Sequence, residues 1–131
     1  MKIWYQHGSE HSANLVMIGH FEGPTNATQA KAIIDALTNQ VAKEQSDETL
    51  IVGSPSDRYS DEMFQLLWNL NIHSIGPQEV EQFAYEVAVQ VNGNDLVLTT
   101  DELDVSAFLK VMIQKGARIE VYSAHDYPDT A

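Results

Sequence analysis

The residues best suited to chemistry lie near the two ends of the chain. The segment His7–His11 has the letters H-x-x-E-H, an order found in one class of zinc peptidases. That chemistry requires a helix, because helical i, i+4 spacing directs both imidazoles toward one zinc ion. Gly8 and Ser9 are poor helix formers. In an extended chain, His7 and His11 would lie roughly 13 Å apart. The pattern therefore does not favour a zinc peptidase.

A second arrangement combines the N-terminal loop with the C-terminal segment. The loop Gly8–Ser12 follows a strand predicted over Lys2–His7, and the C-terminal segment follows a strand predicted over Arg118–Tyr122. If these strands are parallel neighbours, both loops lie at one rim of the sheet, a common ligand-binding position in α/β proteins. The residues that would gather there are Glu10, His11, His125 and Asp126.

Imidazole beside carboxylate is suited to general acid–base catalysis, as in a small hydrolase or isomerase. The same rim is suited to a metal-binding protein, with His11, His125 and Asp126 as the metal ligands. The alternative is that Ser9, Glu10 and Ser12 only cap backbone groups of a tight turn. We favour this alternative, so the four residues are candidates and enzymatic activity is left open.

Other kinds of catalytic or cofactor site have no support in the sequence. There is no cysteine, which excludes disulfides and thiolate chemistry. No glycine-rich phosphate loop and no serine at a strand–turn–helix elbow is found, so we expect no cofactor. His20 alternates with Val16 and Ile18 on a predicted strand. This position is typical of a histidine that is hydrogen-bonded within a sheet and not of a ligand.

The elements that must position these residues follow from apolar periodicity. Two-residue alternation predicts strands, and three- and four-residue spacing predicts helices. Beyond Lys2–His7, the predicted strands are Asn14–Glu22, an optional Thr49–Val52, Phe83–Val91, Leu96–Leu98 and Arg118–Tyr122. The predicted helices cover Asn26–Val41, Ser60–Leu70 and the stretch after Thr99 up to Ile113.

Several local signals support these boundaries. Asn92-Gly93 is typical of a tight hairpin turn. Thr99 and Glu102 have the spacing of a capping box, and Gly116 is suited to a helix stop. The order is ββα(β)-α-ββαβ, which predicts a single two-layer α+β domain over residues 1–131. Its mixed sheet would have about five or six strands, with three helices mostly on one face.

The net charge of the chain limits the classes of partner that it can bind. Nineteen acidic and seven basic residues give a net charge of -12, and no Lys or Arg occurs between Tyr59 and Leu109. Such a surface repels nucleic acid and anionic membranes, but it suits a basic protein partner. An acidic surface that only maintains solubility is the simpler interpretation. No signal peptide or membrane-spanning run is evident, and we expect a cytoplasmic location.

One predicted helix is unusually apolar. The stretch Met63–Leu70 has apolar side chains nearly all round, so it is either deeply buried or contacts another subunit. Its candidate interface residues are Phe64, Leu67 and Trp68. We therefore favour a non-enzymatic binding or regulatory module that forms a homodimer or docks a protein partner. An inhibitor or immunity-type protein that neutralises a basic enzyme is one specific form of this hypothesis.

Short phrases throughout the chain resemble a small family of bacterial proteins of similar length. They are Met1–Trp4, GSEHS at residues 8–12, LVMIG at 15–19, RYSDEM at 58–63, DVSAFLKV at 104–111 and EVYSAHDYP at 120–128. That family has no assigned activity, cofactor or catalytic residue. The resemblance therefore implies a bacterial cytoplasmic protein and adds nothing to the candidate site.

Overall fold

The computed structural model describes residues 14–54 and 56–123 of the 131-residue chain. Its strands are β1 (Leu15–His20), β2 (Val87–Asn92), β3 (Asp95–Thr100) and β4 (Arg118–Ser123). Its helices are α1 (Pro24–Ser46), α2 (Asp61–Asn69), the 3₁₀ helix η2 (Pro77–Ala84) and α3 (Ser106–Gln114). The α+β class is confirmed. The predicted strand Lys2–His7 lies outside the described residues.

The four described strands form one sheet in the order β2-β3-β1-β4, and all neighbours are antiparallel. β1 and β2 are parallel to each other with β3 between them, and β3 and β4 are parallel with β1 between them. This βαββαβ order is that of ferredoxin-like folds, with α2 and η2 inserted before β2. The expected mixed sheet of five or six strands is therefore wrong for the described part, and so is the expected number of three helices, because the described part has four, counting η2. Each crossover skips a strand, so parallel strands never become neighbours.

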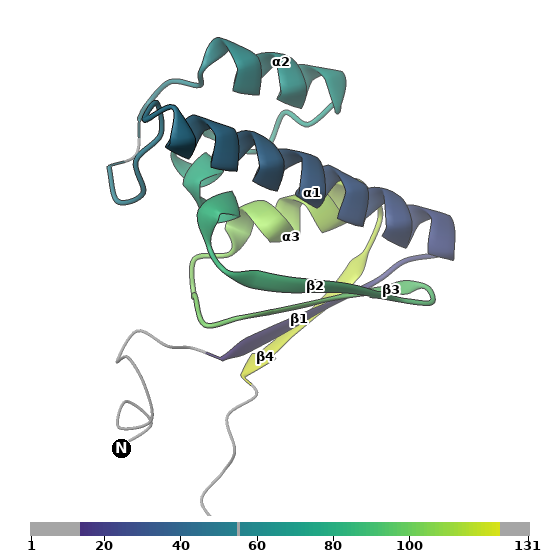
Figure 1. Ribbon diagram of the computed structural model, residues 1–131. Coiled ribbons are helices and arrows are strands. Elements are labelled where there is room, and N and C mark those ends of the chain that lie inside the picture. The colour runs from purple at the N-terminus through teal and green to yellow at the C-terminus, as the bar shows by residue number, and fades with distance from the viewer. Residues whose placement is uncertain (1–13, 55, 124–131) are drawn as a thin grey trace, which may run out of the picture.

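The helices lie on one side of the sheet. α1 and α3 cover the same face, and α2 lies beyond α1 on the side away from the sheet (Figure 1). Met17, Leu96 and Leu98 point into this core and are fully buried. The helix predicted over Asn26–Val41 is confirmed within α1, and its apolar residues at three- and four-residue steps form a buried stripe of Ala30, Ile33, Ile34, Leu37 and Val41. No helix in the described part of the chain combines the length and apolar character needed to cross a bilayer.

The opposite face of the sheet is not covered by any described helix (Figure 1). β1 lies between β3 and β4 in the sheet, which fits its apolar residues on both faces. Val16 and Ile18 are half-buried on the open face, and Tyr122 is 49% exposed beside Val16. A four-stranded antiparallel sheet with one open face is a common form of this architecture.

The predicted β2–β3 hairpin is confirmed. Asn92 pairs with Asp95, so the loop consists of Gly93 and Asn94 alone. Gly93 has φ 64°, as the first position of a type II′ turn requires. Positive φ at this position is unfavourable for a residue with a Cβ atom, which explains the glycine.

The chain before β2 differs from the prediction. Phe83 was expected at the start of a strand but lies in η2, and β2 begins only at Val87. Phe83 follows Val80 by three residues, the repeat of a 3₁₀ helix. Both side chains are buried, and the Phe83 ring packs against that of Phe108 in α3, with the ring centroids 4.9 Å apart. Phe83, Tyr85 and Val87 follow a two-residue repeat, so the sequence predicted a strand where the 3₁₀ helix forms.

No strand forms over Thr49–Val52, which corrects the optional strand predicted there. The backbone N–H groups of Thr49 and Leu50 donate to the Glu44 carbonyl at 2.8 and 3.2 Å. These bonds fold the chain back over the C-terminal end of α1. The same backbone groups are then not available for a sheet ladder.

The start of α3 is capped from a distant part of the chain. Gln82 is 2% exposed, and its Oε1 accepts a hydrogen bond from the Ala107 N–H at 2.7 Å. Its Nε2 donates to Asp104 at 2.9 Å and to the Ser106 hydroxyl at 3.1 Å. The predicted cap at Thr99 is wrong, because Thr99 lies within β3. Gln82 therefore performs the role that a local N-cap side chain performs in other helices.

The end of α3 was predicted correctly. Gly116 has φ 88° and follows the last turn of the helix, and its N–H donates to the Ile113 carbonyl at 2.9 Å. A glycine in this left-handed conformation is a frequent helix stop. The chain then turns directly into β4.

Glu79 joins η2 to α3. Its carboxylate accepts from the Gly76 N–H at 2.8 Å, the Ser106 hydroxyl at 2.5 Å and the Lys110 ammonium at 2.6 Å. Burial alone raises the pKa of Glu79, but the hydrogen bonds from Gly76, Lys110 and Ser106 outweigh burial, and the pKa is lowered. The carboxylate is therefore strongly held in its charged form.

Candidate functional site

The four candidates for the rim lie outside the described residues, and they are Glu10, His11, His125 and Asp126. The described chain bears on their placement in one respect. Leu15, the first residue of β1, pairs with Ser123, the last residue of β4. The chain therefore enters β1 and leaves β4 at the same end of the sheet. Among the described residues, no group of three or more acidic or histidine side chains is arranged to hold a metal ion.

His20 is hydrogen-bonded within the sheet, as its position in the sequence predicts. Its Nδ1 lies 2.9 Å from Asp95 Oδ1, and its Nε2 lies 3.1 Å from Glu120 Oε1. The hydrogen bond with Glu120, followed by that with Asp95, raises the pKa of His20 above 6.5. Because both ring nitrogens are engaged by carboxylates, His20 is not placed to act as a metal ligand or a general base.

The apolar helix α2 begins at a well-formed cap. The hydroxyl of Ser60 accepts from the Met63 N–H at 3.0 Å, so Ser60 is the N-cap of the helix. Met63 and Leu67 are 1% and 4% exposed and face the core. Leu67 is thus a core residue, and the candidate interface is left with Phe64 and Trp68.

Phe64 and Trp68 lie on the outer side of α2 and are 53% and 62% exposed. Their rings are stacked, with centroids 6.4 Å apart and planes at 24°. At one end, the ring centroids of Tyr59 and Phe64 are 6.1 Å apart. At the other end, those of Trp68 and His73 are 5.4 Å apart. We call Tyr59, Phe64, Trp68 and His73 the aromatic row. Tyr59 is half-buried, whereas Phe64, Trp68 and His73 are exposed, and exposed aromatic rings in contact are frequent on protein-binding surfaces.

The ends of the row are anchored by hydrogen bonds. The Tyr59 hydroxyl donates to the Ile75 carbonyl. Burial, with a smaller contribution from the charge of Glu79, raises the pKa of Tyr59, so the hydroxyl remains a donor at neutral pH. His73 Nε2 bonds to Asn71 at 3.0 Å. The row is thus held at both ends by ordinary contacts, while the two central rings face solvent.

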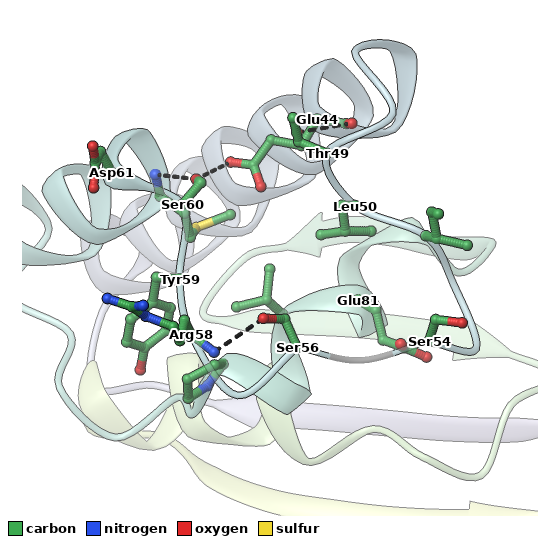
Figure 2. A pocket seen from close by; sticks show the side chains of 14 residues that line it. Glu44, Thr49, Leu50, Ser54, Ser56, Arg58, Tyr59, Ser60, Asp61 and Glu81 are labelled. Carbon is green, nitrogen blue, oxygen red and sulfur yellow. Dashed lines mark hydrogen bonds between the residues drawn. The ribbon is translucent and has the colours of Figure 1, made fainter.

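A cavity of about 430 Å³ adjoins the N-terminal end of α2. It lies between the end of α1, the chain leading into α2, and η2. Figure 2 shows Glu44 and Ser60 at one end of it and Ser54, Ser56 and Glu81 on the opposite side. The volume is in the range of small-molecule sites.

Glu44 is the buried polar group of this cavity. It is 4% exposed, and its Oε2 accepts from the Ser60 hydroxyl at 2.7 Å and from Gln40 Nε2 at 2.8 Å. Our sequence reasoning missed this residue. A signal was present, because Glu44 follows Val41 by three residues and so continues the buried stripe of α1. An acidic residue at such a position indicates a buried carboxylate.

The opposite wall contains a second carboxylate, Glu81. It lies 3.3 Å from the Gly53 backbone nitrogen, which donates to it, and 3.5 Å from the Tyr85 hydroxyl. Burial raises the pKa of Tyr85, and the charge of Glu81 raises it further. Glu81 therefore holds the loop at Gly53 and adds an acidic side chain to the lining of the cavity.

A model of a family of unknown function (DUF6375) matches residues 1–131, so the chain belongs to that family over its whole length. The resemblance found in the sequence phrases, to a small family without assigned activity, is thereby confirmed. No curated protein and no solved structure matches the chain.

Proposed function

We propose that this chain is a non-enzymatic binding or regulatory module of the bacterial cytoplasm that docks a basic protein segment on the aromatic row. One observation carries the proposal. Phe64 and Trp68 are large, stacked and exposed on a helix whose inner face is already buried in the core. Aromatic side chains of this kind contribute a large share of the binding free energy of protein interfaces.

Charge favours a basic partner over a second copy of the chain. Each copy has a net charge of -12, so two copies repel each other at long range. Asp61 and Glu62 lie in the first turn of α2, and the helix contains no basic residue. Exposed Trp and Phe rings attract guanidinium and ammonium groups. A segment rich in arginine or lysine would therefore be attracted first by the acidic surface and then by the rings.

The proposal is tested with a fluorescein-labelled nona-arginine peptide, whose binding is followed by fluorescence anisotropy. Phe64→Ser and Trp68→Ser should each raise the Kd by roughly tenfold. The matched control is Leu103→Ser, which removes an apolar side chain that is 70% exposed elsewhere on the surface. This control should leave the Kd unchanged.

Two results would contradict the proposal. Equal binding by Phe64→Ser, Trp68→Ser and Leu103→Ser would show that the peptide recognises only the overall charge. A dimer in light scattering that Trp68→Ser converts to a monomer would instead make α2 the interface of a homodimer. The anisotropy and scattering measurements therefore distinguish a basic partner from a second copy.

The rim of Glu10, His11, His125 and Asp126 supports a second candidate, a small hydrolase, isomerase or metal-binding protein. The observation that favours it is the pairing of Leu15 with Ser123, because both segments that carry these residues join the sheet at one end. Titration calorimetry with Zn²⁺ tests it. Binding by the wild type that is lost in the double variant His11→Ala, His125→Ala would support a metal site, and equal binding by both would reject it.

A further inference from the structure

We propose that the cavity beside the N-terminal end of α2 binds a small primary alkylammonium compound, with Glu44 as its counter-ion. The proposal does not depend on the aromatic row, which lies on the outer surface of α2. It rests on the burial and hydrogen bonding of Glu44, on the acidic wall opposite, and on the apolar side chains between them.

The Glu44 carboxylate is only partly satisfied. Its Oε2 accepts from Ser60 and Gln40, whereas its Oε1 accepts no hydrogen bond from any described residue. In the described part of the chain, no fully buried side-chain nitrogen or oxygen lacks a hydrogen-bond partner. Oε1 is therefore accessible, and the space it faces is the cavity that Glu44 lines. Figure 2 shows this carboxylate directed into that space.

No basic side chain among the described residues forms a salt bridge with Glu44. A carboxylate that is 4% exposed has lost most of its contact with water, so an ammonium group would restore both charge balance and hydrogen bonding. Such pairs are stronger than neutral hydrogen bonds. Glu44 is therefore suited to bind a cation inside the cavity.

The rest of the lining selects against an anion. Glu81 and Asp61 add two further acidic groups, whereas Arg58 is the one basic residue among the described lining residues and is exposed. The N-terminal end of α2 would attract an anion, but Ser60 already caps it and Asp61 occupies its first turn. An anionic ligand would thus meet three carboxylates and one exposed guanidinium.

Apolar side chains in the lining favour a ligand with an aliphatic chain. Leu50, Met63 and Val80 line the cavity together with Ile51, which is exposed. A butyl chain would contact these side chains while its ammonium reaches Glu44. We therefore choose n-butylamine as the probe and 1-butanol, of equal length and without charge, as its control.

Titration calorimetry or ¹H–¹⁵N NMR at neutral pH tests the proposal. Wild-type protein should bind n-butylamine at least tenfold more tightly than 1-butanol. Glu44→Gln keeps the size of the side chain and an oxygen that accepts from Ser60, and it should weaken n-butylamine binding at least tenfold. The matched control is Glu48→Gln, which removes an equal charge from an exposed position. It should change the affinity less than twofold.

A second variant keeps the test decisive if Glu44→Gln does not fold. Ile51 is 62% exposed, so Ile51→Trp places bulk at the cavity margin without disturbing the core. It should also weaken n-butylamine binding at least tenfold. The proposal is overturned if the wild type does not bind n-butylamine. It is equally overturned if both variants bind n-butylamine as the wild type does, or if 1-butanol binds equally well.

Discussion

Replacing Gln82 with methionine removes the cap of α3 while keeping the size of the side chain. In the wild type, Gln82 accepts from the Ala107 N–H at 2.7 Å and donates to Asp104 and Ser106. Methionine has no such donor or acceptor. Because Ala107 is completely buried, water cannot readily replace the lost partner of its N–H group.

The size of the effect follows from these contacts. Loss of an N-cap costs about 1 kcal/mol, within a range of roughly 0.5–2 kcal/mol. A buried donor left without a partner costs about 1–3 kcal/mol, and this value partly overlaps the first. Methionine fills the space, so only a small cavity cost is added. We therefore expect Gln82→Met to lower the free energy of unfolding by about 2–4 kcal/mol, a large fraction of the stability of a domain of this size.

Urea denaturation followed by far-UV circular dichroism measures this change. The midpoint should fall while the slope of the free energy against urea stays constant, because the surface exposed on unfolding does not change. Gln78→Met is the matched control, since Gln78 lies in the same helix η2 and is not buried. Its free energy of unfolding should stay within about 0.5 kcal/mol of the wild type. A Gln82→Met variant as stable as this control would refute the role assigned to Gln82.

Three further predictions concern ionisation and backbone conformation. Because the pKa of Glu79 is lowered, its charge stabilises the fold above pH 4.5. This contribution is lost as the pH falls through the lowered pKa. The stability advantage of the wild type over Glu79→Gln in urea should therefore shrink below pH 4.5, and a constant difference would contradict this. His20 should titrate with a pKa above 6.5 by NMR. In Glu120→Gln its pKa should shift toward 6.5, and an unchanged value would exclude the hydrogen bond as the cause. Gly116 has φ 88°, and a Cβ atom added to it would meet no other atom within 4 Å, so Gly116→Ala should cost about 1–2 kcal/mol from conformation alone. A variant of equal stability in urea would contradict this reason.

Most of the described fold could be predicted from local periodicity. The apolar periodicity of the sequence predicted β1, α1, α2, the β2–β3 hairpin and β4. In α1, for example, the repeating apolar residues form the buried stripe. The failures involve contacts between distant residues. Thr99 has a local capping pattern, but the group that caps α3 is Gln82, which lies 25 residues before Ala107. No local pattern can identify such a partner.

The candidate site shows the same division. Exposed aromatic residues on α2 could be predicted from its excess of apolar side chains. The sequence could not predict which apolar residues of α2 face the core, because a helix that is apolar nearly all round has no clear inner face. Only packing in the folded chain distinguishes buried Leu67 from exposed Trp68. The cavity at Glu44 depends on three separate segments meeting, so its sequence signal was limited to one acidic residue on a buried stripe.

The central position of β1 also affects synthesis of the protein. β1 is the earliest described strand to leave the ribosome, but it pairs only with β3 and β4. Within β1, His20 can form its hydrogen bonds only after Asp95 and Glu120 are translated, 75 and 100 residues later. Such distant pairing slows folding, and until β4 is translated one edge of β1 lacks its neighbour. A nascent chain that stops before Arg118 therefore exposes the apolar strand edge at Val16 and Ile18, which makes prematurely terminated products candidates for aggregation and for removal by proteases.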